Sequence, residues 1–122
     1  MKVPQKTCYD LHTHSKLSDG SLSPASLIAL AEKQGVTHLS ITDHDTLNAY
    51  AQLASDTFQL TLIPGIELST QWQGRCIHIV GLNVDPASTS MQTAVESQKN
   101  AREKRAELIA HRLKKAGIDA AL

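Results

Sequence analysis

Six side chains of types that bind divalent metal ions lie between positions 12 and 78 of the sequence. They are four histidines and two carboxylates, His12, His14, Asp19, His44, Glu67 and His78. Neutral imidazole together with carboxylate suits Mn, Zn or Fe, whereas Mg or Ca alone favours an all-oxygen set of ligands. Six ligands exceed the three or four that one zinc ion needs, so we expect two or three clustered ions, with Glu67 free to bridge.

Clustered divalent ions favour the hydrolysis of phosphate esters. They lower the pKa of a bound water from ~15.7 toward ~7, and they clamp the attacking and leaving oxygens of the ester. The sequence shows no Ser-His-Asp or Cys-His arrangement and no Gly-rich phosphate loop that would compete for this role. We therefore expect attack by a metal-bound hydroxide, with no catalytic side chain needed beyond the metal ligands.

A few neighbouring residues are candidates for supporting roles. Asp10 and Asp43 can orient adjacent histidines by hydrogen bonding, although ordinary strand-end or N-cap roles fit their positions equally well. Lys16 lies in the loop beside the candidate ligands and can contact a substrate phosphate. We expect Cys8 and Cys76 to be small core residues rather than ligands.

The elements that must position these ligands alternate between strand and helix. We expect strands over residues 8–14, 37–42, 60–69 and 76–84, and helices over about 24–34, 47–54 and 89–116. This order is typical of a parallel α/β sheet or barrel, with too few units here to close a barrel. Every candidate ligand falls at or just after a strand, and strand C-termini are where α/β folds gather their functional groups.

Local signals support these boundaries. Ser23 before Pro24 predicts an N-cap followed by proline at the first helical position, and Gly35 is placed to end that helix. Pro64-Gly65 predicts an interruption inside the third strand, and Gln73-Gly74 can turn it back into the fourth. The last helix is polar over residues 96–105, so we expect that stretch to be exposed.

Five short motifs, in order and with fitting gaps, resemble those of the PHP (polymerase and histidinol phosphatase) family. They are Asp10-Leu11-His12-Thr13-His14, Ser18-Asp19-Gly20, Thr42-Asp43-His44, Pro64-Gly65-Ile66-Glu67 and Ile77-His78-Ile79-Val80-Gly81. The resemblance covers residues 8 to about 115 and is greatest to the TrpH-like branch, which includes ribonuclease AM. It implies the N-terminal portion of a distorted seven-stranded β/α barrel with a three-ion site.

The resemblance also assigns the ligands. It divides them among three ions, a first at His12 and His14, a second at His78 that Glu67 bridges to the first, and a third at Asp19 and His44. The family pattern needs three further ligands, a His and an Asp-x-His pair, from its C-terminal half. The only later histidine here is His111, within the expected long helix. We therefore expect residues 1–122 to be the N-terminal part of a PHP domain, with the metal site on about 8–84 and a basic helix on about 89–117.

The branch implies hydrolysis of 3′,5′-nucleoside bisphosphates or trimming of short RNA from its 5′ end. Mn²⁺ is the first expectation for the metal, with Zn²⁺, Fe²⁺ or Mg²⁺ as alternatives. A nucleotide or short RNA is the expected partner, and neither a membrane nor a protein partner is inferred. Three rival readings are a metal-binding fragment without turnover, a histidinol-phosphatase-like enzyme, and an amidohydrolase barrel, which shares the His-x-His start.

The charge balance does not by itself indicate nucleic acid, because 12 basic and 12 acidic residues cancel. Seven of the basic residues lie in residues 90–116, so the last helix can attract RNA, although a solvated charged face is the commoner meaning of such a run. Residues 1–6 lack the apolar core of a signal peptide, no apolar run reaches ~20 residues, and two cysteines are too few for a disulfide framework. We expect a cytoplasmic, soluble protein whose unclosed sheet exposes strand edges and apolar surface and promotes association.

Overall fold

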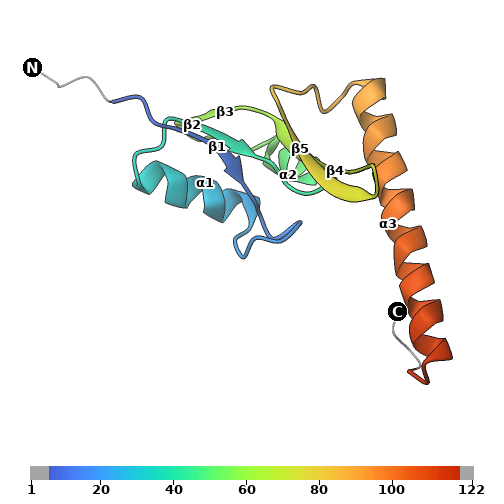
Figure 1. Cartoon of the computed structure of the whole chain (residues 1–122). Helices are drawn as coiled ribbons and strands as arrows, with labels where there is room; N and C mark the ends of the chain where they lie inside the picture. Colours follow the sequence, from blue (N-terminus) through green and yellow to red (C-terminus); the bar gives the residue numbers. More distant parts are fainter. Residues whose placement is uncertain (1–5, 119–122) are drawn as a thin grey trace, which may run out of the picture.

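The computed structural model describes residues 6–118, so residues 1–5, which belong to the segment without a signal-peptide pattern, lie outside the described part. Three helices and five strands follow one another along it (Figure 1). In chain order they are β1 (Tyr9–Thr13), α1 (Pro24–Lys33), β2 (His38–Ile41), α2 (Asn48–Leu53), β3 (Thr61–Leu62), β4 (Gly65–Trp72), β5 (Arg75–Leu82) and α3 (Thr89–Lys115).

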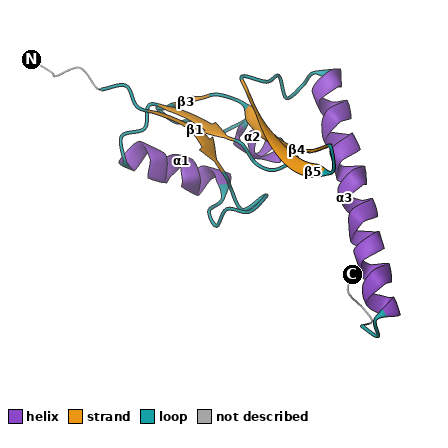
Figure 2. Ribbon diagram, viewed as in Figure 1, coloured by secondary structure: helices purple, strands orange, loops and turns teal. Residues whose placement is uncertain are grey.

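The first three strands form a parallel sheet in the order β1-β2-β3. The helices α1 and α2 pack against this sheet and supply four of the seven buried side chains of its apolar core (Figure 2). The buried core side chains are Ile28, Ala31, Leu39, Ile41, Ala49, Leu53 and Leu60. The α/β class and the parallel sheet expected from the sequence are thereby confirmed.

Helix α1 begins and ends where its sequence predicts. The side chain of Ser23 accepts a hydrogen bond from the Ser26 amide at 3.2 Å, and Pro24 occupies the first turn, where its missing N–H leaves no helical bond unmade. Gly35 follows with a φ of 85°, a left-handed conformation that glycine adopts without steric cost. The helix therefore returns the chain to the start of β2.

The prediction of a single third strand over residues 60–69 is wrong, because this segment forms two strands, β3 and β4, in different sheets. The chain leaves the parallel sheet after β3 and starts β4 at Gly65, which pairs antiparallel with β5. Pro64 cannot donate a backbone hydrogen bond, and a Cβ on Gly65 would clash with the Ser40 hydroxyl. The break lets β4 cross close to β2, while Gln73 and Gly74, with φ of 48° and 73°, form the hairpin turn.

Helix α3 is long, polar and weakly packed. Ser88 caps its start by accepting from the Met91 amide at 3.1 Å, and none of its 27 residues is buried. It lies beside the β4–β5 hairpin, away from α1 (Figure 1). Among the described residues, no helix is both long and apolar enough to cross a membrane.

Candidate metal centre

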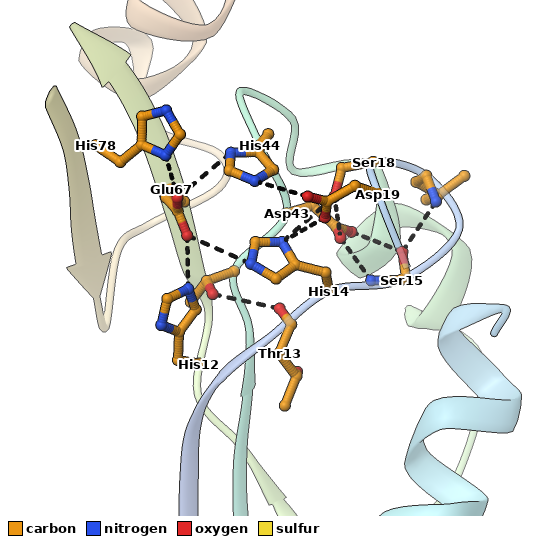
Figure 3. Close-up of polar contacts among 12 residues, drawn as sticks. His12, Thr13, His14, Ser15, Ser18, Asp19, Asp43, His44, Glu67 and His78 are labelled. Carbon is orange, nitrogen blue, oxygen red and sulfur yellow. Dashed lines mark hydrogen bonds and ion pairs between the residues drawn. The ribbon is translucent and has the colours of Figure 1, made fainter. Parts of the chain in front are cut away.

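The structure brings all six predicted ligands together at one end of the parallel sheet (Figure 3). They come from β1, the loop after it, the turn after β2, and the two strands of the hairpin. An isolated parallel bridge between His44 and Glu67 joins that turn to β4. The split between β3 and β4 is therefore what carries Glu67, and with it His78, over the ends of β1 and β2.

Glu67 lies at the centre of the cluster and is only 5% exposed. Its Oε1 is 2.6 Å from His12 Nε2 and 3.3 Å from His14 Nε2, and its Oε2 is 2.7 Å from His78 Nδ1 and 3.4 Å from His44 Nδ1. Burial raises the pKa of Glu67, but the His12 hydrogen bond, the His44 charge and the His78 hydrogen bond outweigh it, and the net pKa is lowered. The carboxylate is therefore held in its ionised form.

Asp19 closes the cluster on the side away from Glu67. Its two oxygens lie 3.3 Å from His14 Nδ1 and 3.2 Å from His44 Nε2, and its side chain is 65% exposed. The rings of His14 and His44 stack between the two carboxylates, with centroids 4.6 Å apart and an interplanar angle of 16°. These imidazoles thus offer one nitrogen toward Asp19 and the other toward Glu67.

Three overlapping sets of donor atoms result, each spanning no more than 4.8 Å. The sets are His12, His14 and Glu67; His14, Asp19 and His44; and His44, Glu67 and His78. Two donors bound tetrahedrally to one ion at ~2.1 Å stand about 3.4 Å apart. The separations of 3.2–3.4 Å that His14 and His44 make with the carboxylates fit that spacing. The donor sets therefore suit divalent ions. His14 and His44 each occur in two sets, but a neutral imidazole has only one nitrogen with a free lone pair, so each of them can bind an ion in only one set at a time.

The loop that carries Asp19 is held by a buried carboxylate. Asp43 accepts hydrogen bonds from the Ser15 amide at 2.6 Å, the Ser15 hydroxyl at 2.7 Å and the Ser18 hydroxyl at 2.8 Å. The Ser18 hydroxyl lies 3.5 Å from His14 Nδ1. Asp43 was expected either to orient a neighbouring histidine or to take an ordinary strand-end or N-cap role. Within residues 6–118 its carboxylate accepts only from these two serines, so it reaches His14 only indirectly, through Ser18. Asp10 is exposed on β1.

A cavity of about 620 Å³ opens over the cluster, between the hairpin and α3. His44, His78 and Asp19 line one side of it, and Arg102 and Arg105 of α3 line the other. Lys16, expected near a substrate phosphate, is exposed and is not part of this lining. The arrangement places positive charge opposite the candidate metal ligands.

Two features of the site were missed or wrong at the level of sequence. Asp45 and Arg102 form an ion pair at 2.7 Å beside the cavity, and the sequence did not predict it. The only hint in the sequence was that Asp45 belongs to the acidic run Asp43-His44-Asp45. Cys8 and Cys76 were expected in the core but are exposed. Cys8 precedes β1, and Cys76 lies on β5, where it lines the open cavity that faces α3.

A family model described as the PHP domain matches residues 10–119. The chain is 50% identical over 112 residues to a 5′-3′ exoribonuclease of Haemophilus influenzae, covering 90% of this chain and 41% of that protein. It is 35% identical over 111 residues to a 3′,5′-nucleoside bisphosphate phosphatase of Chromobacterium violaceum, covering 89% of this chain and 39% of that protein. The chain thus spans about 40% of the length of these relatives.

Solved structures agree with this match. An amidohydrolase from Chromobacterium violaceum, solved with sulfate and no metal, superposes with a TM-score of 0.77 at 34% identity, covering 92% of this chain and 40% of that one. A Bifidobacterium adolescentis structure, provisionally assigned as a metal-dependent phosphoesterase, gives 0.69 at 25% identity, covering 93% of this chain and 40% of that one. The α/β arrangement seen here therefore corresponds to part of a larger fold in both.

Proposed function

The chain belongs to the PHP domain family, and on that premise we propose that its six clustered ligands form part of the active site of a metal-dependent phosphoesterase. The relatives are a 5′-3′ exoribonuclease and a 3′,5′-nucleoside bisphosphate phosphatase. We infer the corresponding substrates, which are 3′,5′-nucleoside bisphosphates or the 5′ ends of short RNA. The site occupies residues 8–84, and the basic helix over residues 89–117 forms its outer wall.

The observation that carries this proposal is the position of Glu67. A buried carboxylate that has four imidazole nitrogens within 3.4 Å, and that belongs to two of the three donor sets, is suited to bridge two cations. Mn²⁺ is the ion we propose first, with Zn²⁺, Fe²⁺ and Mg²⁺ as alternatives. When bound, such ions lower the pKa of a bound water and neutralise charge on the phosphate oxygens.

The chain's own residues supply position and charge. Asp43 holds the Ser15–Ser18 loop, and through it Asp19, against the end of β2. The charge of Arg102 is paired with Asp45, so Arg105 is the arginine that gives the facing wall of the cavity its positive charge, which attracts a substrate that carries phosphate. Specificity for a phosphate ester over a neutral substrate follows from this wall as well as from the metal ligands.

The test measures Mn²⁺ content by elemental analysis together with phosphate release from adenosine 3′,5′-bisphosphate. We expect the wild-type chain to retain Mn²⁺ and release phosphate, and the His78→Ala variant to lose both. His111→Ala is the matched control, because His111 is exposed on α3 outside the cluster. An amide substrate tested in parallel should not be cleaved.

Each alternative outcome has a definite meaning. Mn²⁺ retention without phosphate release would favour a metal-binding role that is catalytically incomplete. Cleavage of the amide at a rate similar to that of the phosphate ester would favour amidohydrolase chemistry, the description given to the Chromobacterium violaceum structure. Equal metal content in wild type and His78→Ala would refute the proposed site.

A further inference from the structure

One buried carboxylate beside the cluster is not itself among the candidate ligands. Asp45 directly follows His44, and its side chain is only 2% exposed. Its φ of 55° lies in the left-handed region, which among non-glycine residues Asn and Asp adopt most readily. A charge buried in such a constrained turn is costly unless it is paired. The partners of Asp45 therefore indicate what the turn is built to hold.

Those partners tie the turn after β2 to two other elements. The carboxylate of Asp45 accepts from the Ser69 amide of β4 at 2.9 Å and from Arg102 Nε of α3 at 2.7 Å. The Asp45 amide donates to the Glu67 carbonyl at 2.9 Å, and the Glu67 amide donates to the Asp43 carbonyl at 3.0 Å. Hydrogen bonds from the turn thus fix β4 at Glu67 itself and two residues beyond it.

Arg102 is also the point at which α3 is attached to the site. No residue of α3 is buried, and within residues 6–118 the pair with Asp45 is the ion pair that joins α3 to another element. Arg102 lines the cavity together with His44 and His78. One contact therefore links the position of the helix over the cavity to the position of the turn.

We propose that Asp45 and Arg102 form a positioning pair that holds His44 and Glu67 in register for metal binding and fixes α3 over the cavity. The inference rests on the proposed metal-binding function. Neither residue touches the ions in this scheme; both act through the turn that carries His44 and through its bonds to β4. Residues that orient metal ligands in this way typically change metal affinity about 10–100-fold when they are replaced.

Two conservative changes separate the charge from the backbone geometry. Asp45→Asn keeps an oxygen that can accept from Ser69 and tolerates the left-handed conformation, but it removes the negative charge. Arg102→Gln removes the positive charge. We expect each variant to bind Mn²⁺ about 10-fold more weakly by titration calorimetry, and the double variant also to lose about 10-fold, because the pair acts as one unit. Asp56→Asn and Arg112→Gln, both at exposed positions, are the charge-matched controls and should bind as wild type does.

A second readout needs no metal. The Asp45 and Glu67 amides donate the hydrogen bonds that join the turn to β4. If Arg102 holds the turn in place, these amides should exchange their hydrogens faster in metal-free Arg102→Gln than in the metal-free wild type. If wild type binds no Mn²⁺, the proposed function fails, while faster exchange still supports the positioning role. The proposed pair would be refuted if Arg102→Gln left both the Mn²⁺ affinity and the amide exchange rates unchanged. It would also be refuted if the double variant lost about 100-fold in Mn²⁺ affinity, because the two residues would then act independently.

Discussion

At the scale of single residues, Glu67 is the side chain on which the cluster most depends. It belongs to two of the three donor sets, whereas His12 belongs to one. Glu67→Gln preserves the shape of the side chain and removes its charge, which both sets need to hold a cation. We expect Mn²⁺ affinity to fall at least about 100-fold in Glu67→Gln, which is more than is typical when a residue that only orients a metal ligand is replaced. The loss should also be larger than in His12→Ala. Titration calorimetry measures both losses.

The control for this change is Glu103→Gln, which removes the same charge from an exposed position on α3. It should leave Mn²⁺ affinity unchanged, so that any general effect of net charge is excluded. A Glu67→Gln chain that still bound Mn²⁺ as tightly as His12→Ala would show that Glu67 does not bridge. The ions would then have to lie on the Asp19 side of the cluster.

The sequence was informative at this scale where ligand type and strand position agree. Histidines and acids at strand ends were predicted to meet, and the structure brings them together. Asp45 was missed because its partners, Ser69 and Arg102, lie 24 and 57 residues away and follow no local pattern. Asp43 was recognised, but its role in holding the Ser15–Ser18 loop depends on how that loop folds back.

At the scale of elements, Tyr50 on α2 joins β2 to the start of β4. Its hydroxyl donates to the Ile41 carbonyl at 2.5 Å and accepts from the Gly65 amide at 2.8 Å. Tyr50→Phe leaves these strand groups without that partner, which costs about 1–3 kcal/mol of unfolding free energy. Urea unfolding at pH 7 measures this loss, and Tyr9→Phe, at an exposed position, is the control and should lose little.

The same prediction has a pH dependence with a definite sign. Burial raises the pKa of Tyr50 above its ordinary 10.0, and the nearby Asp43 charge raises it a little further. Hydrogen bonds with Gly65 and Ile41 lower the pKa, but not enough to offset the burial. The unfolded chain loses the tyrosine proton first, so this contribution is intact below pH ~10 and is lost as the pH rises through the folded-state pKa. The stability gap between wild type and Tyr50→Phe should therefore narrow above pH ~10. A gap that stayed constant up to pH 11 would contradict the burial of this hydroxyl.

Elements governed by local chemistry were predicted well, and those governed by tertiary contact were not. The cap at Ser23, the stop at Gly35 and the turn at Gln73-Gly74 depend on neighbouring residues and lie where expected. The strand over 60–69 was not expected to divide between two sheets. That division depends on the close packing of Gly65 against Ser40 of β2, which no local pattern encodes.

At the scale of the whole molecule, the hairpin exposes apolar surface on an outer strand. In the register of β4 with β5, Leu68 pairs with Ile79 and Thr70 with Ile77, so these side chains share the face opposite Glu67 and His78. Ile79 is 54% exposed and Ile77 is 36% exposed. In the relatives, about 60% of the chain lies outside the region that matches this one, so their corresponding surface has more protein available to cover it.

We therefore expect this chain to self-associate through the apolar face of β5 and through the edge of β5 that no strand pairs with in the described part of the chain. Sedimentation velocity should show an average mass that rises with protein concentration, and Ile79→Lys should weaken association about 10-fold, because a charge would have to be buried at the contact. Leu30→Lys makes the same change on α1, where the exposed leucine lies on a different surface, and should leave association unaltered. A single monomeric species at all concentrations would contradict this prediction. Equal effects of Ile79→Lys and Leu30→Lys on association would show that the apolar face of β5 is not the contact surface.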